Sequence, residues 1–171
     1  MKYTSAEAAK LIRQLKEEHQ LIRTKENKTS IFQAAVGENA EELRPSYDYG
    51  ETQQALAEVE RKIRKVKHAV SLFNLNTQVE GMTIDEVLVY LPQLQERRSK
   101  LSAMVDRMPK QRAKSGFMSR YTEKSAIIDY EYANYDIGKA EEDLRNVSEE
   151  IARLQTALDV ANTTGELEIE L

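Results

Sequence analysis

Apolar residues recur at alternating intervals of three and four positions along the middle of the chain. The clearest stretch has apolar side chains at Leu56, Val59, Ile63, Val66, Val70 and Phe73. This heptad spacing is the seam of a helix that pairs with a second helix, as in a coiled coil. We therefore predict a helix over about 50–75 whose apolar seam is covered by a partner helix.

The same spacing resumes directly downstream, and this second seam is the partner that we predict. Its positions are Ile84, Val87, Leu91, Leu94, Arg98, Leu101, Val105 and Met108. A turn at Gly81 would join the helices 50–75 and 84–108 into a helical hairpin. Pro92 lies inside the second helix, and its missing N–H group predicts a kink there.

Arg98 is the charged residue in this second seam. Folding the hairpin about its turn places Arg98 opposite Glu60, and an ion pair between them would set the register of the two helices. The alternative is that Arg98 lines an anion pocket, inside the protein or between subunits.

Two further helices are predicted at the ends of the chain. Thr4 and Glu7 form a capping box before an apolar stripe, which predicts a helix over about 5–27. Asp136 precedes another heptad pattern and predicts a helix over about 136–162.

Short strands are predicted outside the helices. Residues 166–171 alternate glutamate with apolar side chains, so this segment should dock on a sheet of its own chain or of another subunit. Residues 115–132 alternate in their second half. Residues 29–36 are rich in apolar and β-branched side chains, and they suit a strand as well as a continuation of the first helix.

Together these elements predict a mainly α protein with one domain over 1–171. Its four long helices would form antiparallel coiled-coil-like pairs or a bundle, with a small β element from the long connections. The composition agrees, because 40% apolar and 32% charged residues with only six Gly are typical of a helix-rich folded protein. Apolar residues outside the seams, such as Leu72 and Leu88, predict a homo-oligomer that covers them.

Charge and residue content exclude several classes of function. The net charge of -4 gives no strong case for a nucleic-acid partner. The chain has no cysteine, which excludes disulfides, thiolate nucleophiles and cysteine metal sites. No segment resembles a signal peptide or reaches the roughly 18–20 apolar residues of a membrane span. We therefore expect a cytoplasmic protein without a membrane partner.

Catalytic and metal-binding signatures are missing from the sequence. His19 and His68 stand alone, so we predict no metal site. The six glycines are too widely spaced for a phosphate-binding loop, and no hydroxyl has an identifiable base beside it. We expect neither an enzyme nor a cofactor.

From about residue 56 onward the chain carries a series of short motifs in a recognisable order. These motifs are Phe73-Asn74-Leu75-Asn76-Thr77, Thr83-Ile84-Asp85-Glu86-Val87-Leu88, Arg97-Arg98, Arg120-Tyr121, Asp136-Ile137, Asn162-Thr163-Thr164 and Glu166-Leu167. In order and spacing they resemble the septicolysin-like family of small bacterial or phage-borne helical proteins. The family often has a tryptophan after the asparagine matched by Asn162, whereas this chain has no Trp. The resemblance implies an all-helical, oligomeric protein of undefined activity.

The connection 109–135 is the candidate ligand-binding segment. Its arginine and lysine side chains suit phosphate groups, and its tyrosine rings can stack on a planar ring. With Arg98 from the preceding helix, the candidate ligand-binding residues are Arg112, Lys114, Arg120, Tyr121, Tyr130 and Tyr132. The alternative is that the tyrosines pack on the helices and the basic side chains are merely solvated.

Two functions remain open at this stage. The first is a non-enzymatic, homo-oligomeric helical interaction or scaffold protein. The second is an oligomer that binds or sequesters a small anionic, nucleotide-derived ligand in pockets between subunits, lined by the segment 109–135. A phage protein that sequesters a host immune nucleotide would be one such case.

Overall fold

The computed structural model describes residues 1–113 and 130–171, and within these ranges the protein is mainly α-helical. The four long helices of the described residues are α1 (Ser5–Thr29), α3 (Tyr49–Asn76), α4 (Ile84–Val105) and α5 (Ile137–Thr164). A single helical turn, α2 (Ala40–Leu43), lies in the connection between α1 and α3. The predicted fold class is confirmed, and each long helix begins within a residue of its predicted start.

The strands of the described residues form three small antiparallel pairs. These pairs are β1 (Lys2–Thr4) with β6 (Glu166–Glu168), β2 (Gln78–Val79) with β3 (Met82–Thr83), and β4 (Lys110–Arg112) with β5 (Tyr130–Tyr132). β5 lies inside the predicted segment 115–132, and β6 lies inside 166–171. Thr29 is the last residue of α1, and residues 30–36 form neither of the predicted alternatives, because they contain no helix and no strand.

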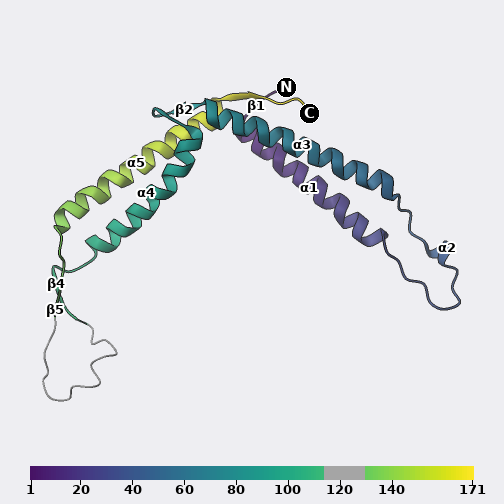
Figure 1. Cartoon of the computed structure of the whole chain (residues 1–171), viewed down its shortest axis with the longest axis horizontal. Coiled ribbons are helices and arrows are strands. Elements are labelled where there is room, and N and C mark those ends of the chain that lie inside the picture. The colour runs from purple at the N-terminus through teal and green to yellow at the C-terminus, as the bar shows by residue number, and fades with distance from the viewer. Residues whose placement is uncertain (114–129) are drawn as a thin grey trace, which may run out of the picture. The chain divides into compact units, whose positions relative to one another are not determined.

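The chain divides into two compact units, one containing residues 1–85 with 158–171 and the other containing residues 86–157. In the first unit α1 and α3 lie side by side (Figure 1). His19 Nε2 lies 3.1 Å from Glu60 Oε1. Two helical turns further along α1, Glu26 Oε1 accepts a hydrogen bond from Gln53 Nε2 of α3 at 2.7 Å. Seven residues forward on α1 thus correspond to seven residues backward on α3, so the antiparallel register does not slip over this length.

The core of this first unit is a narrow seam between the two helices. Val66 of α3 and Ala8 of α1 are completely buried. The other buried helix side chains of the seam are Leu15, Leu56, Val59 and Phe73. Each buried CH₂ group contributes about 0.8 kcal/mol, so this seam holds the two helices together.

The partner predicted for the Leu56–Phe73 seam is corrected by the structure, since α1 covers this seam. Glu60, which the hairpin register placed opposite Arg98, contacts His19 of α1. The prediction of the partner was wrong because heptad spacing shows that an apolar seam must be covered but does not show which matching helix covers it.

The β1–β6 pair joins the two ends of the chain, and Met1 N donates to Ile169 O at 3.1 Å.

The second unit is built in the same way from α4 and α5, which lie side by side in Figure 1. Their buried residues within 86–157 are Val87, Leu91, Leu94 and Leu101 from α4 and Ala140, Val147, Ile151 and Leu154 from α5. The Tyr90 hydroxyl donates to Glu150 Oε1 at 3.1 Å, and the Tyr135 hydroxyl donates to Met104 O at 2.7 Å. α4 continues without a break through Pro92.

Candidate functional site

The β4–β5 pair belongs to the second unit and extends from the ends of α4 and α5 (Figure 1). Its register opposes Lys110 to Tyr132 and Arg112 to Tyr130, with Gln111 opposite Glu131. Side chains alternate between the two faces of a strand, and directly opposed residues share a face. One face of this pair therefore carries two cations and two tyrosines, and we call it the basic–aromatic face: Lys110, Arg112, Tyr130 and Tyr132.

The side chains of this face converge on one another. Lys110 Nζ lies 4.2 Å from the centroid of the Tyr130 ring and 5.3 Å from the centroid of the Tyr132 ring. Both distances are within the range of a cation–π interaction. Tyr130 is 47% exposed and Tyr132 is 64% exposed, so neither ring is packed away beneath the helices.

The basic–aromatic face also has an excess of positive charge. Within the described residues, neither Lys110 nor Arg112 forms a salt bridge. The nearest strand carboxylate, Glu131, belongs to the opposite face, where its Oε2 accepts a hydrogen bond from Gln111 Nε2 at 2.9 Å. Two cations that lack a salt bridge in the described part of the chain, beside two accessible rings, suit an anion that carries a planar group.

The structure brings together three of the predicted site residues, namely Arg112, Tyr130 and Tyr132. Lys114, Arg120 and Tyr121 lie outside the described residues. Arg98 lies on α4, where it is exposed, and is not part of the strand pair. Lys110 was missed as a site residue, although its position two residues before Arg112 carries the period-two signal that would have found it.

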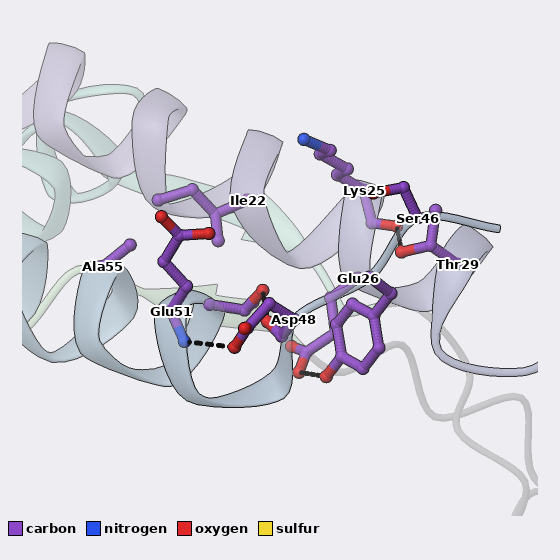
Figure 2. Close-up of a pocket in the computed structure, with 10 residues that line it drawn as sticks. Ile22, Lys25, Glu26, Thr29, Ser46, Asp48, Glu51 and Ala55 are labelled. Carbon is purple, nitrogen blue, oxygen red and sulfur yellow. Dashed lines mark hydrogen bonds between the residues drawn. The ribbon is translucent and has the colours of Figure 1, made fainter.

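Apart from the basic–aromatic face, a concave region lies between α1, α3 and the connection that joins them, and Figure 2 shows it. Its volume is about 370 Å³. The residues that line it are Ile22, Lys25, Glu26, Thr29, Ser46, Tyr47, Asp48, Glu51, Thr52 and Ala55. With three carboxylates and one lysine, this acidic pocket is electrostatically unsuited to an anionic ligand.

The polar groups of the acidic pocket hold the α1–α3 connection in place. The Tyr47 hydroxyl donates to Glu26 Oε1 at 3.0 Å. Asp48 Oδ1 accepts the Glu51 backbone N–H at 2.8 Å, and so caps α3 (Figure 2). Burial raises the pKa of the Tyr47 hydroxyl, and the hydrogen bond to Glu26 and the negative charge of that carboxylate raise it further. We read these contacts as structural.

No group of three or more His, Cys, Asp and Glu side chains among the described residues is placed to hold a metal ion. None of the described helices is both long enough and apolar enough to cross a membrane.

Comparison with known proteins shows a likeness in fold. No protein-family model matches the chain, and no curated protein matches it. The fold is similar to the crystal structure of a functionally unknown conserved protein from Corynebacterium diphtheriae, with a TM-score of 0.59 and 19% sequence identity. The likeness covers 98% of this chain and 100% of that chain, and at this identity it shows the fold alone. The septicolysin-like resemblance stays a prediction.

Proposed function

We propose that this chain is a non-enzymatic binding protein whose basic–aromatic face holds, and thereby sequesters, a small nucleotide-derived anion. The observation that carries the proposal is the placement of the Lys110 ammonium over both the Tyr130 and Tyr132 rings, with Arg112 on the same face. Cations and accessible rings on one small surface match the two chemical parts of a nucleotide, which are its phosphate and its base.

The energies of the competing contacts favour the ligand. Lys110 occupies the tyrosine faces in the free protein through cation–π contacts that contribute about 0.5–1 kcal/mol at exposed sites. Stacking of a base on an aromatic side chain contributes about 1–3 kcal/mol. A bound base would therefore displace the ammonium from the rings, and Lys110 would then pair with the phosphate beside the bidentate guanidinium of Arg112.

The non-enzymatic part of the proposal is supported by the side chains on this surface. Lysine, arginine and tyrosine side chains at these exposed positions bind and orient an anion, and the six residues of the β4–β5 pair include no histidine or cysteine. Binding without turnover predicts that the ligand is recovered chemically unchanged after denaturation of the complex.

Thermal-shift and calorimetric titration with nucleoside monophosphates, dinucleotides and cyclic nucleotides tests this function. We expect binding by the wild-type chain, which is abolished in the double variant Tyr130→Ala/Tyr132→Ala and weakened in Arg112→Ala. Arg145→Ala is the matched control, because it removes the same charge from an exposed position on α5. No binding of any of these ligands, or equal binding by all variants, would refute the proposal.

A second proposed function is that of a homo-oligomeric helical scaffold. It is supported by half-exposed apolar side chains outside the seams, Leu72 and Leu75 on α3 and Leu88 and Val89 on α4. Such residues are covered when copies of a chain associate. Sedimentation equilibrium over the micromolar range tests this second function directly, and a monomer at all concentrations would exclude it.

A further inference from the structure

A long groove lies in the first unit between one face of α3 and the segment that contains β6. Its volume is about 770 Å³. From α3 and its end it is lined by Lys65, His68, Ala69, Leu72, Phe73, Asn76 and Thr77, and from the C-terminal segment by residues 165–170. The α3 residues follow helical spacing over three turns, so they form one continuous wall. We call this region the β6 groove.

The floor of the β6 groove is apolar and only partly covered. Phe73, Leu167 and Ile169 are buried, whereas Leu72 is 46% exposed at the groove and Leu75 is 54% exposed one turn further along α3. An exposed leucine pair beside a preformed apolar groove is a surface that gains free energy when another apolar surface covers it.

The two walls of the β6 groove carry opposite charges. Lys65 gives the α3 wall a positive charge, and Glu168 and Glu170 give the β6 wall negative charges. Glu166 is already neutralised by Lys2, whose Nζ lies 2.9 Å from Glu166 Oε2. Among the described residues, no salt bridge neutralises the other charges of either wall.

We infer that the β6 groove is the contact surface between two copies of this chain. This inference rests on the proposed self-assembly and is independent of ligand binding at the basic–aromatic face. In a two-fold interface the same patch contacts itself, so the patch must be self-complementary. If the axis runs along the groove, the α3 wall of each copy meets the β6 wall of its partner. Lys65 then faces the partner's acidic wall, and the two Leu72 side chains meet over the apolar floor.

The groove is rigid enough to serve as an interface. β6 is held by its pairing with β1, and Ile169 N donates to Met1 O at 2.9 Å. At the other end, Gly165 lies against the Phe73 ring. A wall that is fixed in the monomer loses little conformational entropy on association, which favours binding.

The decisive variant is Leu72→Glu, which places a charge in the centre of the proposed contact. We expect a wild-type dimer by sedimentation velocity and light scattering, and a dissociation constant raised roughly tenfold or more by Leu72→Glu. Leu43→Glu is the matched control, because Leu43 on α2 is similarly exposed, at 49%, and lies outside the groove, so this variant should leave the dimer unchanged. Circular dichroism melting confirms that each variant is folded.

Charge reversal tests the pairing of the walls. Lys65→Glu alone and Glu168→Lys/Glu170→Lys together should each weaken the dimer, and the triple variant should restore it, because the walls again carry opposite charges. Oligomers that persist unchanged in Leu72→Glu would overturn the groove as the interface while leaving self-assembly intact. A wild-type monomer would overturn both. A monomer whose sedimentation with phosphatidylcholine vesicles depends on Leu72 would replace the second copy by a lipid surface.

Discussion

The backbone of Gly165 lies directly against the ring of Phe73. A Cβ atom at position 165 would come within 2.5 Å of Phe73 Cζ and within 2.7 Å of the backbone oxygen of Ala161. Phe73 closes the α3 seam, and Gly165 follows the end of α5. This close approach fixes the direction in which the chain leaves α5 and enters β6.

Gly165→Ala should therefore destabilise the first unit. The added methyl group meets the ring and a backbone oxygen at the same time, so a side-chain movement alone cannot relieve the contact. Overpacking of this kind costs about 1–3 kcal/mol, which urea denaturation would detect. Gly50→Ala is the control, since its Cβ has only an ordinary contact of 3.4 Å in a helix turn. We expect Gly50→Ala to be neutral or stabilising, and equal losses in both variants would contradict the argument.

Alkaline pH should reduce stability through two tyrosines. Burial and a hydrogen bond to Glu26 raise the pKa of Tyr47 above its ordinary value of 10.0, and burial and a hydrogen bond to Glu150 raise the pKa of Tyr90. A raised pKa means that the folded state favours the protonated phenol. This contribution to stability is complete below pH 10.0 and is lost as the pH rises through the folded-state pKa.

The measurement is the free energy of unfolding between neutral pH and the alkaline range. Tyr47→Phe/Tyr90→Phe should begin less stable, because two hydrogen bonds are lost, and should then show a shallower decline with pH than the wild type. Lysines also lose their charge in this range, and comparison of the two slopes removes their contribution. Parallel slopes would show that neither tyrosine carries the effect.

The capping box at the start of α1 should be measurable by itself. Thr4 Oγ1 accepts the Glu7 backbone N–H at 3.2 Å, and Glu7 Oε2 accepts the Thr4 backbone N–H at 2.8 Å. Thr4→Ala should lower the free energy of unfolding by about 1 kcal/mol, whereas Thr4→Ser keeps the hydroxyl and should stay near the wild type. A Thr4→Ala variant as stable as the wild type would show that the cap contributes nothing to the free energy of unfolding beyond what the β1–β6 pairing already supplies.

Lys110 should matter for ligand binding beyond its contact with the tyrosines. Lys110→Met keeps most of the side-chain stem but removes the charge that would pair with the phosphate. We expect the affinity of the best nucleotide to fall about tenfold, which corresponds to about 1.4 kcal/mol. Lys100→Met removes the same charge from an exposed position on α4 and should leave affinity unchanged. Tighter binding in Lys110→Met would mean that the ammonium only competes with the base for the rings.

Local features of the chain were predicted well because they depend on neighbours in sequence. Helical spacing placed the four long helices, and Asp136 caps α5 through its Oδ1, which accepts the Lys139 backbone N–H at 3.1 Å. The alternation of 166–171 placed β6, since a strand repeats every two residues. At the candidate site, the same alternation indicated that Tyr130 and Tyr132 share a face.

Only the tertiary structure decided how these pieces combine. Several helices carry an apolar stripe that could cover the Leu56–Phe73 seam. No feature of neighbouring residues in the sequence selects one of them, so the pairing with α1 is decided by packing between distant segments of the chain. The strand that receives β6 is the first few residues of the chain, too short to be recognised before its partner is known. The period-two spacing could have placed Lys110 on the same face as Arg112. Its position over two rings, however, depends on the register of β4 with β5, which is set by pairing across 20 residues of sequence.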